Sequence, residues 1–239
     1  MSFVEQQNNH NSEYQKELWN RQHSERGGFG GREDILRFDP NESAIQFGEL
    51  IKNNSTILEI GSSNGRDARY WASEGHLVFC LDFSEVALIQ LRDIAEKQMV
   101  SKNIVPILHD INCSDLPIEG HLFDGFYARS SLHIGDEETM NLINKIDNHL
   151  KPEAKILIMG KSLDDEKIQR SEIIDNNLAI DHEENGHLRR IWTPDFIKKM
   201  CDSVKWSIMS IEQNTEMINN RVTSFIKLIA EKKWINPEQ

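Results

Sequence analysis

Hydrophobic positions between residues 56 and 160 follow two alternating patterns. Short apolar runs typical of buried strands are separated by segments in which apolar residues recur every three or four positions, as on one face of a helix. The predicted strands are 56–60, 76–82, 104–110, 123–130 and 154–160. The helical segments are marked by Ala68, Trp71 and Ala72, then by Leu88, Leu91, Ala95 and Met99, and then by Leu142, Ile143, Ile146 and Leu150. Strands that alternate with helices pair in parallel through right-handed crossovers, so we predict a doubly wound α/β sheet.

Polar residues mark the starts of several predicted helices, and the pattern changes toward the C-terminus. Ser84 and Asp136 stand where N-caps are expected, and Thr193, followed by a proline, begins a further helix. Two strand-like runs come next, 205–213 and 221–233, with a short polar link between them. Two strands this close in sequence form a hairpin, so the sheet is expected to end in an antiparallel pair.

Two segments lie outside this predicted core. The acidic stretch 161–191 is too long for an ordinary connection and is typical of a lid or a binding loop. The first dozen residues are rich in Asn and Gln and are expected to be disordered. We therefore predict an N-terminal extension over residues 1–45 that forms a flap over the active site, followed by one domain over 46–239 with a lid-like insert at about 161–191.

Composition narrows the class of partner. The chain of 239 residues has a formal net charge of −12 and no stripe of Lys and Arg, which argues against nucleic acid and favours a small molecule. It has neither a signal-peptide pattern nor an apolar run of the roughly 18 residues that a membrane span needs, so we expect no membrane partner. Cys80, Cys113 and Cys201 are widely spaced and form no C-x-x-C pair, which fits a cytoplasmic protein without a disulfide framework or a zinc site.

The turn after the first predicted strand, "GSSNG", lies where open α/β sheets bind their ligands. A dinucleotide-binding turn that starts at Gly61 would require glycine at the positions of Ser63 and Arg66, and the P-loop pattern also fails because no Lys-Ser/Thr pair follows Gly65. Glu59 precedes the turn, where a carboxylate suits a cationic group better than a phosphate. The sequence therefore disfavours phosphate ligands at this turn.

The acids that follow indicate a nucleoside without phosphate. Asp82 ends the second strand about twenty residues after Gly61, where a carboxylate can accept hydrogen bonds from a ribose diol. Phe83 can lie against an adenine ring, and Asp110, at the end of the third strand, can accept a hydrogen bond from an exocyclic amine. Each residue alone has a plainer explanation, since a Gly/Ser turn is often only a turn and an acid after a strand is often a helix cap.

These motifs, taken in their order along the chain, resemble those of a known family. "LEIGSSNGRD" resembles the glycine-rich first motif of class I S-adenosylmethionine-dependent methyltransferases, with Ser63 in place of the middle glycine. Asp82, "LHDIN", "FDGFYARS", "LKPEAKILIMG" and the terminal hairpin fall in the order of that family, and "NGRDARYWASEGH" is similar to its small-molecule members of the thiopurine and tellurite-resistance type. The resemblance implies a Rossmann-like sheet of seven strands, mostly parallel, with an antiparallel C-terminal hairpin. It also implies S-adenosyl-L-methionine as the cofactor.

The resemblance further implies which residues contact that cofactor. The turn backbone would pass the methionine part, the acid on the second strand would hold the ribose, and the residues after the third strand would meet the adenine. A tryptophan of the N-terminal segment closes over the site in thiopurine-type relatives, which points to Trp19 here. Glu59 and Arg129 are also expected to contact the cofactor. The full set of expected cofactor-binding residues is Glu59, Gly61, Ser63, Gly65, Asp82, Phe83, Asp110, Ile111, Arg129 and Trp19.

Candidate catalytic residues follow the fourth strand in "YARSSLHIGDEE". His133 has a pKa suited to a general base, and Arg129 can pair with a carboxylate of cofactor or substrate. The plainer interpretation of His133 is a hydrogen-bonded residue near a helix start. Acids near the fifth strand, Asp164 and Asp165, could hold a metal in a catechol-type enzyme, but an acidic loop is usually solvated, so we expect no metal.

These observations predict a methyltransferase that acts on an oxygen, nitrogen or sulfur atom of a small polar metabolite or natural product. DNA base amines are disfavoured because the Asn/Asp-Pro-Pro-aromatic motif is absent after the fourth strand, where the chain has 124–127 "DGFY". An RNA or protein methyltransferase and a non-catalytic S-adenosylmethionine-binding regulator remain alternatives, and a dehydrogenase is third. The expected oligomeric state is a monomer or a homodimer.

Overall fold

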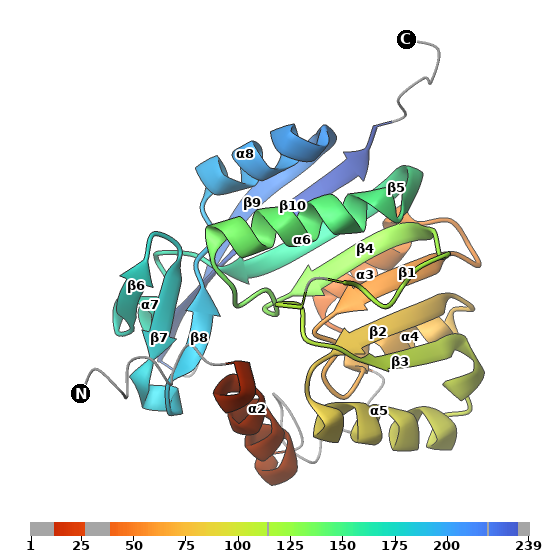
Figure 1. Ribbon diagram of the computed structural model, residues 1–239, viewed down its shortest axis with the longest axis horizontal. Coiled ribbons are helices and arrows are strands. Elements are labelled where there is room, and N and C mark those ends of the chain that lie inside the picture. The colour runs from red at the N-terminus through yellow and green to blue at the C-terminus, as the bar shows by residue number, and fades with distance from the viewer. Residues whose placement is uncertain (1–11, 27–38, 114, 219, 234–239) are drawn as a thin grey trace.

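The computed structural model describes residues 12–26, 39–113, 115–218 and 220–233. Seven strands form one sheet in the order β3-β2-β1-β4-β5-β10-β9 (Figure 1). Strands β1 to β5 are mutually parallel, and β10 pairs antiparallel with both β5 and β9, which confirms the predicted doubly wound sheet and its terminal hairpin. The strands are β1 (Thr56–Ile60), β2 (Leu77–Asp82), β3 (Ile104–Leu108), β4 (Phe123–Arg129), β5 (Leu150–Lys161), β9 (Trp206–Ile218) and β10 (Arg221–Lys232).

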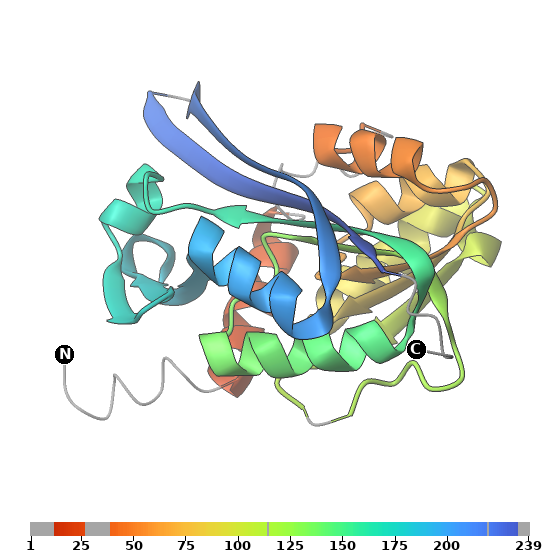
Figure 2. The ribbon, with the colours of Figure 1, turned by 90° about the horizontal axis from the view of Figure 1, so that it is seen from above.

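Helices cover both faces of the sheet because alternate strand residues point to opposite sides. Leu58 of β1 belongs to one apolar cluster, and its neighbour Ile57 belongs to the other. Helices α6 (Asp136–Asn148) and α8 (Pro194–Val204) pack on the first face, and α3 (Glu42–Leu50), α4 (Arg66–Ser73) and α5 (Glu85–Lys97) pack on the second (Figure 2). A short 3-10 helix, η2 (Ser101–Asn103), precedes β3.

Two predicted helix caps are confirmed, and one is wrong. The Ser84 hydroxyl accepts a hydrogen bond from the Ala87 amide at 3.2 Å, and the Thr193 hydroxyl caps α8 in the same way. The N-cap of α6 is Gly135, and Asp136 is the first helical residue. The reason is long-range: the Asp136 carboxylate accepts a hydrogen bond from the Arg190 guanidinium at 2.7 Å, and an acid in the first turn is also favoured by the helix dipole.

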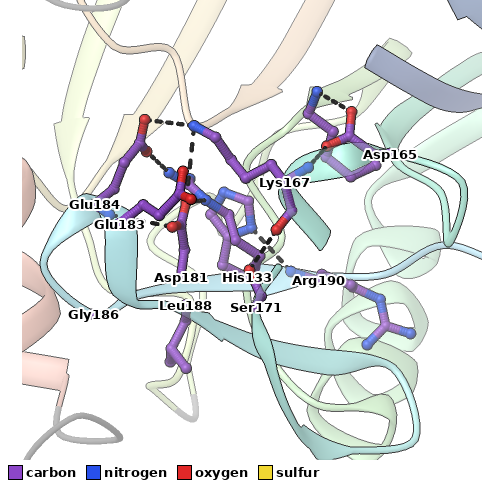
Figure 3. A network of polar contacts seen from close by, with 12 residues as sticks. His133, Asp165, Lys167, Ser171, Asp181, Glu183, Glu184, Gly186, Leu188 and Arg190 are labelled. Atoms are coloured by element: carbon purple, nitrogen blue, oxygen red, sulfur yellow. Dashed lines mark hydrogen bonds and ion pairs between the residues drawn. The ribbon is translucent and has the colours of Figure 1, made fainter. Parts of the chain in front are cut away.

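The stretch 161–191 folds into a small sheet of its own rather than an irregular loop. It contains α7 (Glu166–Gln169), β6 (Glu172–Asp175), β7 (Leu178–Asp181), η3 (His182–Glu184) and β8 (His187–Arg190), and its three strands pair antiparallel in the order β6-β7-β8. Figure 3 shows the Lys167 ammonium between the carboxylates of Asp181 and Glu184. Arg189 pairs with the same two acids, so a buried charge network holds this insert together.

The N-terminal segment contains helix α2 (Ser12–Arg26), which lies between α5 and the insert (Figure 1). The Ser84 hydroxyl donates to the Asn20 side chain at 2.7 Å, and the Gln90 amide donates to the His23 carbonyl at 2.9 Å. The predicted disorder of the first dozen residues and the role of the glycine cluster lie almost wholly outside the described residues. Within the described ranges, no helix is both long and apolar enough to cross a membrane.

The end of β5 meets the end of the insert at a tight contact, which gives a stability prediction. A Cβ atom on Gly160 would lie 2.2 Å from Cδ1 of the buried Trp192 ring, whose backbone amide donates to the Lys161 carbonyl. We expect Gly160→Ala to lower the free energy of unfolding by about 1–3 kcal/mol, because the added methyl group would clash with the buried indole ring.

The matched control is Gly48→Ala in α3, where the added Cβ would have ordinary contacts at 3.6 Å. This control should leave stability unchanged or raise it by up to about 1 kcal/mol, because alanine is the better helix former. Urea denaturation of the two variants measures both effects. Equal stability of Gly160→Ala and the unsubstituted protein would contradict the proposed contact.

Candidate functional site

A cavity of about 500 Å³ lies at the carboxyl ends of β1, β2, β3 and β4. Ligands of open α/β sheets bind in this location, beside the point where strand order reverses. The order β3-β2-β1-β4 places that reversal between β1 and β4. One face of α2 and residues of the insert form the remaining walls, so three parts of the chain distant in sequence build one cavity.

The turn after β1 has a left-handed backbone at Gly61, Ser63 and Gly65, with φ values of 74°, 54° and 74°. A Cβ atom on Gly61 would lie 2.1 Å from the Ser131 Cβ atom, so glycine is required for the close approach of this turn to the end of β4. Gly61 and Ser63 line the cavity. Gly65 does not; it caps α4, and a Cβ there would lie 1.9 Å from Cδ1 of Leu91.

The Asp82 carboxylate holds this turn and the start of α5. One oxygen accepts a hydrogen bond from the Ser63 amide and the other from the Ser84 amide, both at 2.8 Å. Burial raises the pKa of Asp82, and these amide hydrogen bonds oppose that shift. Each oxygen keeps a further lone pair for a donor in the cavity. Phe83, which is half-buried, lines the cavity next to this carboxylate.

Glu59 contributes a buried carboxyl group to the cavity wall. Its side chain is 4% exposed, and Oε2 has no hydrogen-bond partner among the described residues. Burial raises the pKa of Glu59 well above its ordinary value, and the nearby Asp67 and Asp82 raise it further. Asp67 differs because it is already bonded to Asn41 and to the Tyr127 hydroxyl. A buried, unpaired carboxyl group that faces a cavity indicates a ligand that carries a donor or a positive charge.

Asp110 and Ile111 follow β3 and line the same cavity. One oxygen of Asp110 accepts from the Asn112 amide at 2.9 Å, and the other accepts from the Ser12 hydroxyl at the start of α2. The structure thus brings the third predicted acid together with Asp82 and Glu59 and adds a contact from the N-terminal segment.

Trp19 and His133 also line the cavity, where their rings contact each other. Their rings are stacked, with centroids 6.0 Å apart and planes 7° from parallel. Nδ1 of His133 accepts a hydrogen bond from the Arg190 amide at 3.3 Å, so the proton of the neutral ring lies on Nε2, which has no partner among the described residues. Burial lowers the pKa of His133 well below 6.5, and the positive charge of Arg189 and the nearby His187 lower it further. The ring therefore offers a hydrogen-bond donor to the cavity at neutral pH.

Arg129 lies at the end of β4. Its guanidinium carbon lies 5.6 Å from the centre of the Phe225 ring, and its buried Nε makes no hydrogen bond to the described part of the chain. Arg129 lines the cavity and is available to an anionic group.

Several lining residues were missed by the sequence interpretation. Ser12, Gln15 and His23 lie with the predicted Trp19 on one face of α2 at helical spacing, a periodicity that could have been detected. His23 is 2% exposed, burial lowers its pKa to about 4, and its Nδ1 has no partner among the described residues. The insert adds Ile174, Asp175, Leu178 and Leu188, for which the sequence gives no local signal.

The acids considered as metal ligands have structural contacts. Asp165 caps α7 and accepts a hydrogen bond from the Lys161 ammonium at 2.6 Å. Among the described residues, no group of three or more His, Cys, Asp or Glu side chains is arranged to hold a metal ion.

Comparison with known proteins gives the class of the chain. Residues 57–153 match the family model described as a methyltransferase domain. TehB from Haemophilus influenzae is 16% identical with a TM-score of 0.62, and the match covers 90% of this chain and 67% of that one. The CcbJ methyltransferase from Streptomyces caelestis is 16% identical with a TM-score of 0.64, covering 91% and 98%.

A third solved structure is the 1,6-didemethyltoxoflavin-N1-methyltransferase of Burkholderia thailandensis, with bound 1,6-didemethyltoxoflavin and S-adenosylhomocysteine. It is 14% identical with a TM-score of 0.66, covering 92% of this chain and 87% of that one. No curated protein matches the chain. At these identities the solved structures establish a shared fold, and the methyltransferase domain supplies the class of activity. Residues 57–153 therefore match a methyltransferase domain, and the chain has the fold of solved S-adenosylmethionine-dependent methyltransferases.

Proposed function

We propose that the protein transfers a methyl group from S-adenosylmethionine to an oxygen, nitrogen or sulfur atom of a small polar metabolite or natural product. The observation that carries this proposal is the cavity of about 500 Å³, which α2 and the insert partly cover. A volume in this range suits small molecules. A long RNA or a folded protein would need an open groove, and a net charge of −12 also disfavours RNA. We propose further that the protein acts as a monomer or a homodimer without a nucleic-acid partner.

Each part of the cofactor has a chemically suitable group in the cavity. The unpaired carboxyl of Glu59 suits the ammonium of the methionine part, and Arg129 suits its carboxylate. The backbone at Gly61 and Ser63 allows close approach, and the Asp82 carboxylate has lone pairs left for the ribose diol. Phe83 and Ile111 can flank the adenine ring, and Asp110 can accept a hydrogen bond from its amine. Gly65, expected at this site from sequence, acts here through helix packing.

The acceptor is proposed to bind between Trp19, His133 and the insert. Ile174, Leu178 and Leu188 supply an apolar wall for its body, and the Nε2 proton of His133 can hold its heteroatom. When bound, S-adenosylmethionine supplies a methyl group already activated by its sulfonium. The residues of the chain then need only orient the acceptor and exclude water, and orientation can contribute roughly 7–11 kcal/mol. A general-base role for His133 stays a prediction, and the hydrogen bond from the Arg190 amide to Nδ1 supports orientation instead.

The proposal is tested by incubating the protein with metabolite extracts and S-adenosylmethionine that carries an isotopically labelled methyl group. We expect a small molecule to gain one labelled methyl group together with formation of S-adenosylhomocysteine. Labelling of RNA or protein alone would support the alternative enzyme class. Cofactor binding without any labelled product would support a non-catalytic regulator.

Glu59→Gln is expected to stabilise the protein and weaken cofactor binding. The raised pKa of Glu59 means that the folded state is most stable below the pKa of the unfolded state and loses stability as pH rises through the raised pKa. Gln avoids this loss, so the ligand-free variant should be more stable at neutral pH, on the order of 1 kcal/mol. Binding of the cofactor ammonium should expel the Glu59 proton in the wild-type protein only.

Calorimetry of S-adenosylhomocysteine binding in buffers of different ionisation enthalpy measures that proton release. The variant should bind about ten-fold more weakly or worse, without proton release. Glu49→Gln, an exposed change on α3, is the matched control and should alter neither quantity. Equal affinity of wild type and Glu59→Gln would remove Glu59 from the cofactor site.

His133→Asn is expected to lower turnover of the identified acceptor by about ten-fold or more, with unchanged affinity for S-adenosylhomocysteine. Because the pKa of His133 is lowered well below 6.5, its ring stays neutral above that pH, and we expect no inflection from it in the kcat profile there. His182→Asn is the control, because His182 is an exposed insert residue paired with Glu172. An inflection above pH 6.5 that disappears in His133→Asn would restore the general-base hypothesis.

A further inference from the structure

Gln15 links α2 to the insert through two hydrogen bonds made by one buried side chain. Its Nε2 donates to the Gly186 carbonyl at 2.9 Å, and its Oε1 accepts from the Leu188 amide at 3.0 Å. The side chain is 5% exposed, although 171 residues separate it from Gly186 in sequence. Gly186 and Leu188 are seen at the turn into β8 and on that strand in Figure 3.

These bonds satisfy the free edge of the small sheet. Strand β8 is at the end of the order β6-β7-β8, and β7 pairs with it on one side only. An edge strand presents unpaired N–H and C=O groups. The Gln15 amide supplies one acceptor and one donor to two of them, as a neighbouring strand would.

The same contact fixes the register of α2 over the cavity. Trp19 is one helical turn after Gln15, stacks on His133 and has the Arg189 guanidinium 5.6 Å from its ring centre. The other flank of α2 is bonded to α5 through Asn20 and the His23 carbonyl. Helix α2 is therefore bonded to α5 on one side and to the insert on the other. The buried hydrogen bonds of Gln15 connect it to the insert.

We propose that Gln15 is a positioning residue for methyl transfer: it locks α2 onto β8 and so holds Trp19 against His133 at the acceptor wall. This inference rests on the proposed function of the cavity. Because Ser12, Trp19 and His23 of the same helix line the cavity, separation of α2 from β8 would widen the exit for bound cofactor product. Gln15 consequently controls the rate at which S-adenosylhomocysteine dissociates.

Gln15→Met tests this role, because methionine has a similar length and makes neither hydrogen bond. We expect S-adenosylhomocysteine to dissociate roughly ten-fold faster from the variant, in line with the loss of one to two buried hydrogen bonds. Release of labelled ligand during a chase with unlabelled ligand gives the rate. Tyr14→Phe is the matched control: it removes only the exposed bond from the Tyr14 hydroxyl to the Asn185 carbonyl, which joins the same two parts. S-adenosylhomocysteine should dissociate from this control at a rate within about two-fold of that from wild type.

Gln15→Glu adds a pH-dependent readout that a purely structural role would not give. An ionised carboxylate cannot donate to the Gly186 carbonyl, whereas the protonated acid restores both bonds. Burial places the pKa of the introduced acid above about 4.3. The ratio of the variant dissociation rate to that of wild type should therefore fall toward one as pH drops from about 8 to 5.

Other groups near the contact do not account for such a change. The pKa of His187 and of His23 is lowered to about 4, and that of His133 is also lowered, so their rings remain neutral over most of this window. The remaining charged neighbours are Arg21 on α2 and Lys167, Asp181, Glu184 and Arg189 on the insert. All of them are present in both proteins, so the ratio isolates the substitution.

The outcomes separate this inference from the proposed function. Failure of wild type to bind S-adenosylhomocysteine would overturn the proposed function itself. Normal binding with equal dissociation rates in wild type and Gln15→Met would overturn the role of Gln15 alone. If Gln15→Met loses its folded circular dichroism spectrum, the Gln15→Glu ratio decides: a fall with decreasing pH supports the inference, and a constant ratio contradicts it.

Discussion

The paired hydrogen bonds of the Asp82 carboxylate are the interaction on which the site depends. One carboxylate oxygen holds the Ser63 amide of the turn after β1, and the other holds the Ser84 amide at the start of α5. Ser63 is in a left-handed conformation that a non-glycine residue adopts at some cost, and the bond to Asp82 offsets that cost. The same carboxylate faces the cavity. A single buried acid thus joins two strand ends, orders the turn and keeps lone pairs for a ligand.

The cavity is completed by parts that belong to no strand of the main sheet. Helix α2 supplies Trp19, and the insert supplies an apolar wall, while the core supplies the acids. Glu59 shows the cost of this arrangement, since a buried carboxyl without a partner among the described residues destabilises the ligand-free fold. Such groups concentrate at functional sites because a ligand relieves them. Helix α2 and the insert both lie outside residues 57–153, the part of the chain that matches the methyltransferase domain.

Local patterns predicted most of the fold and the cofactor half of the site. Strand periodicity located β1 to β5, and short-range polar signals located the caps at Ser84 and Thr193. Long-range contacts could not be predicted from such local patterns. Asp136 was expected to cap α6 but is its first helical residue, where its carboxylate pairs with Arg190. Gln15 was missed because its partners come 171 and 173 residues later, and no local pattern encodes them. The His133 tautomer likewise depends on an amide from the insert.

Calorimetric titration with S-adenosylmethionine and, separately, with NAD tests the central claim most directly. The turn after β1 lacks the glycines that a pyrophosphate requires, and the buried Glu59 carboxyl suits a cationic group better than a phosphate. We therefore predict saturable binding of one S-adenosylmethionine per chain and no heat of binding from NAD. Tight binding of NAD without binding of S-adenosylmethionine would contradict the account.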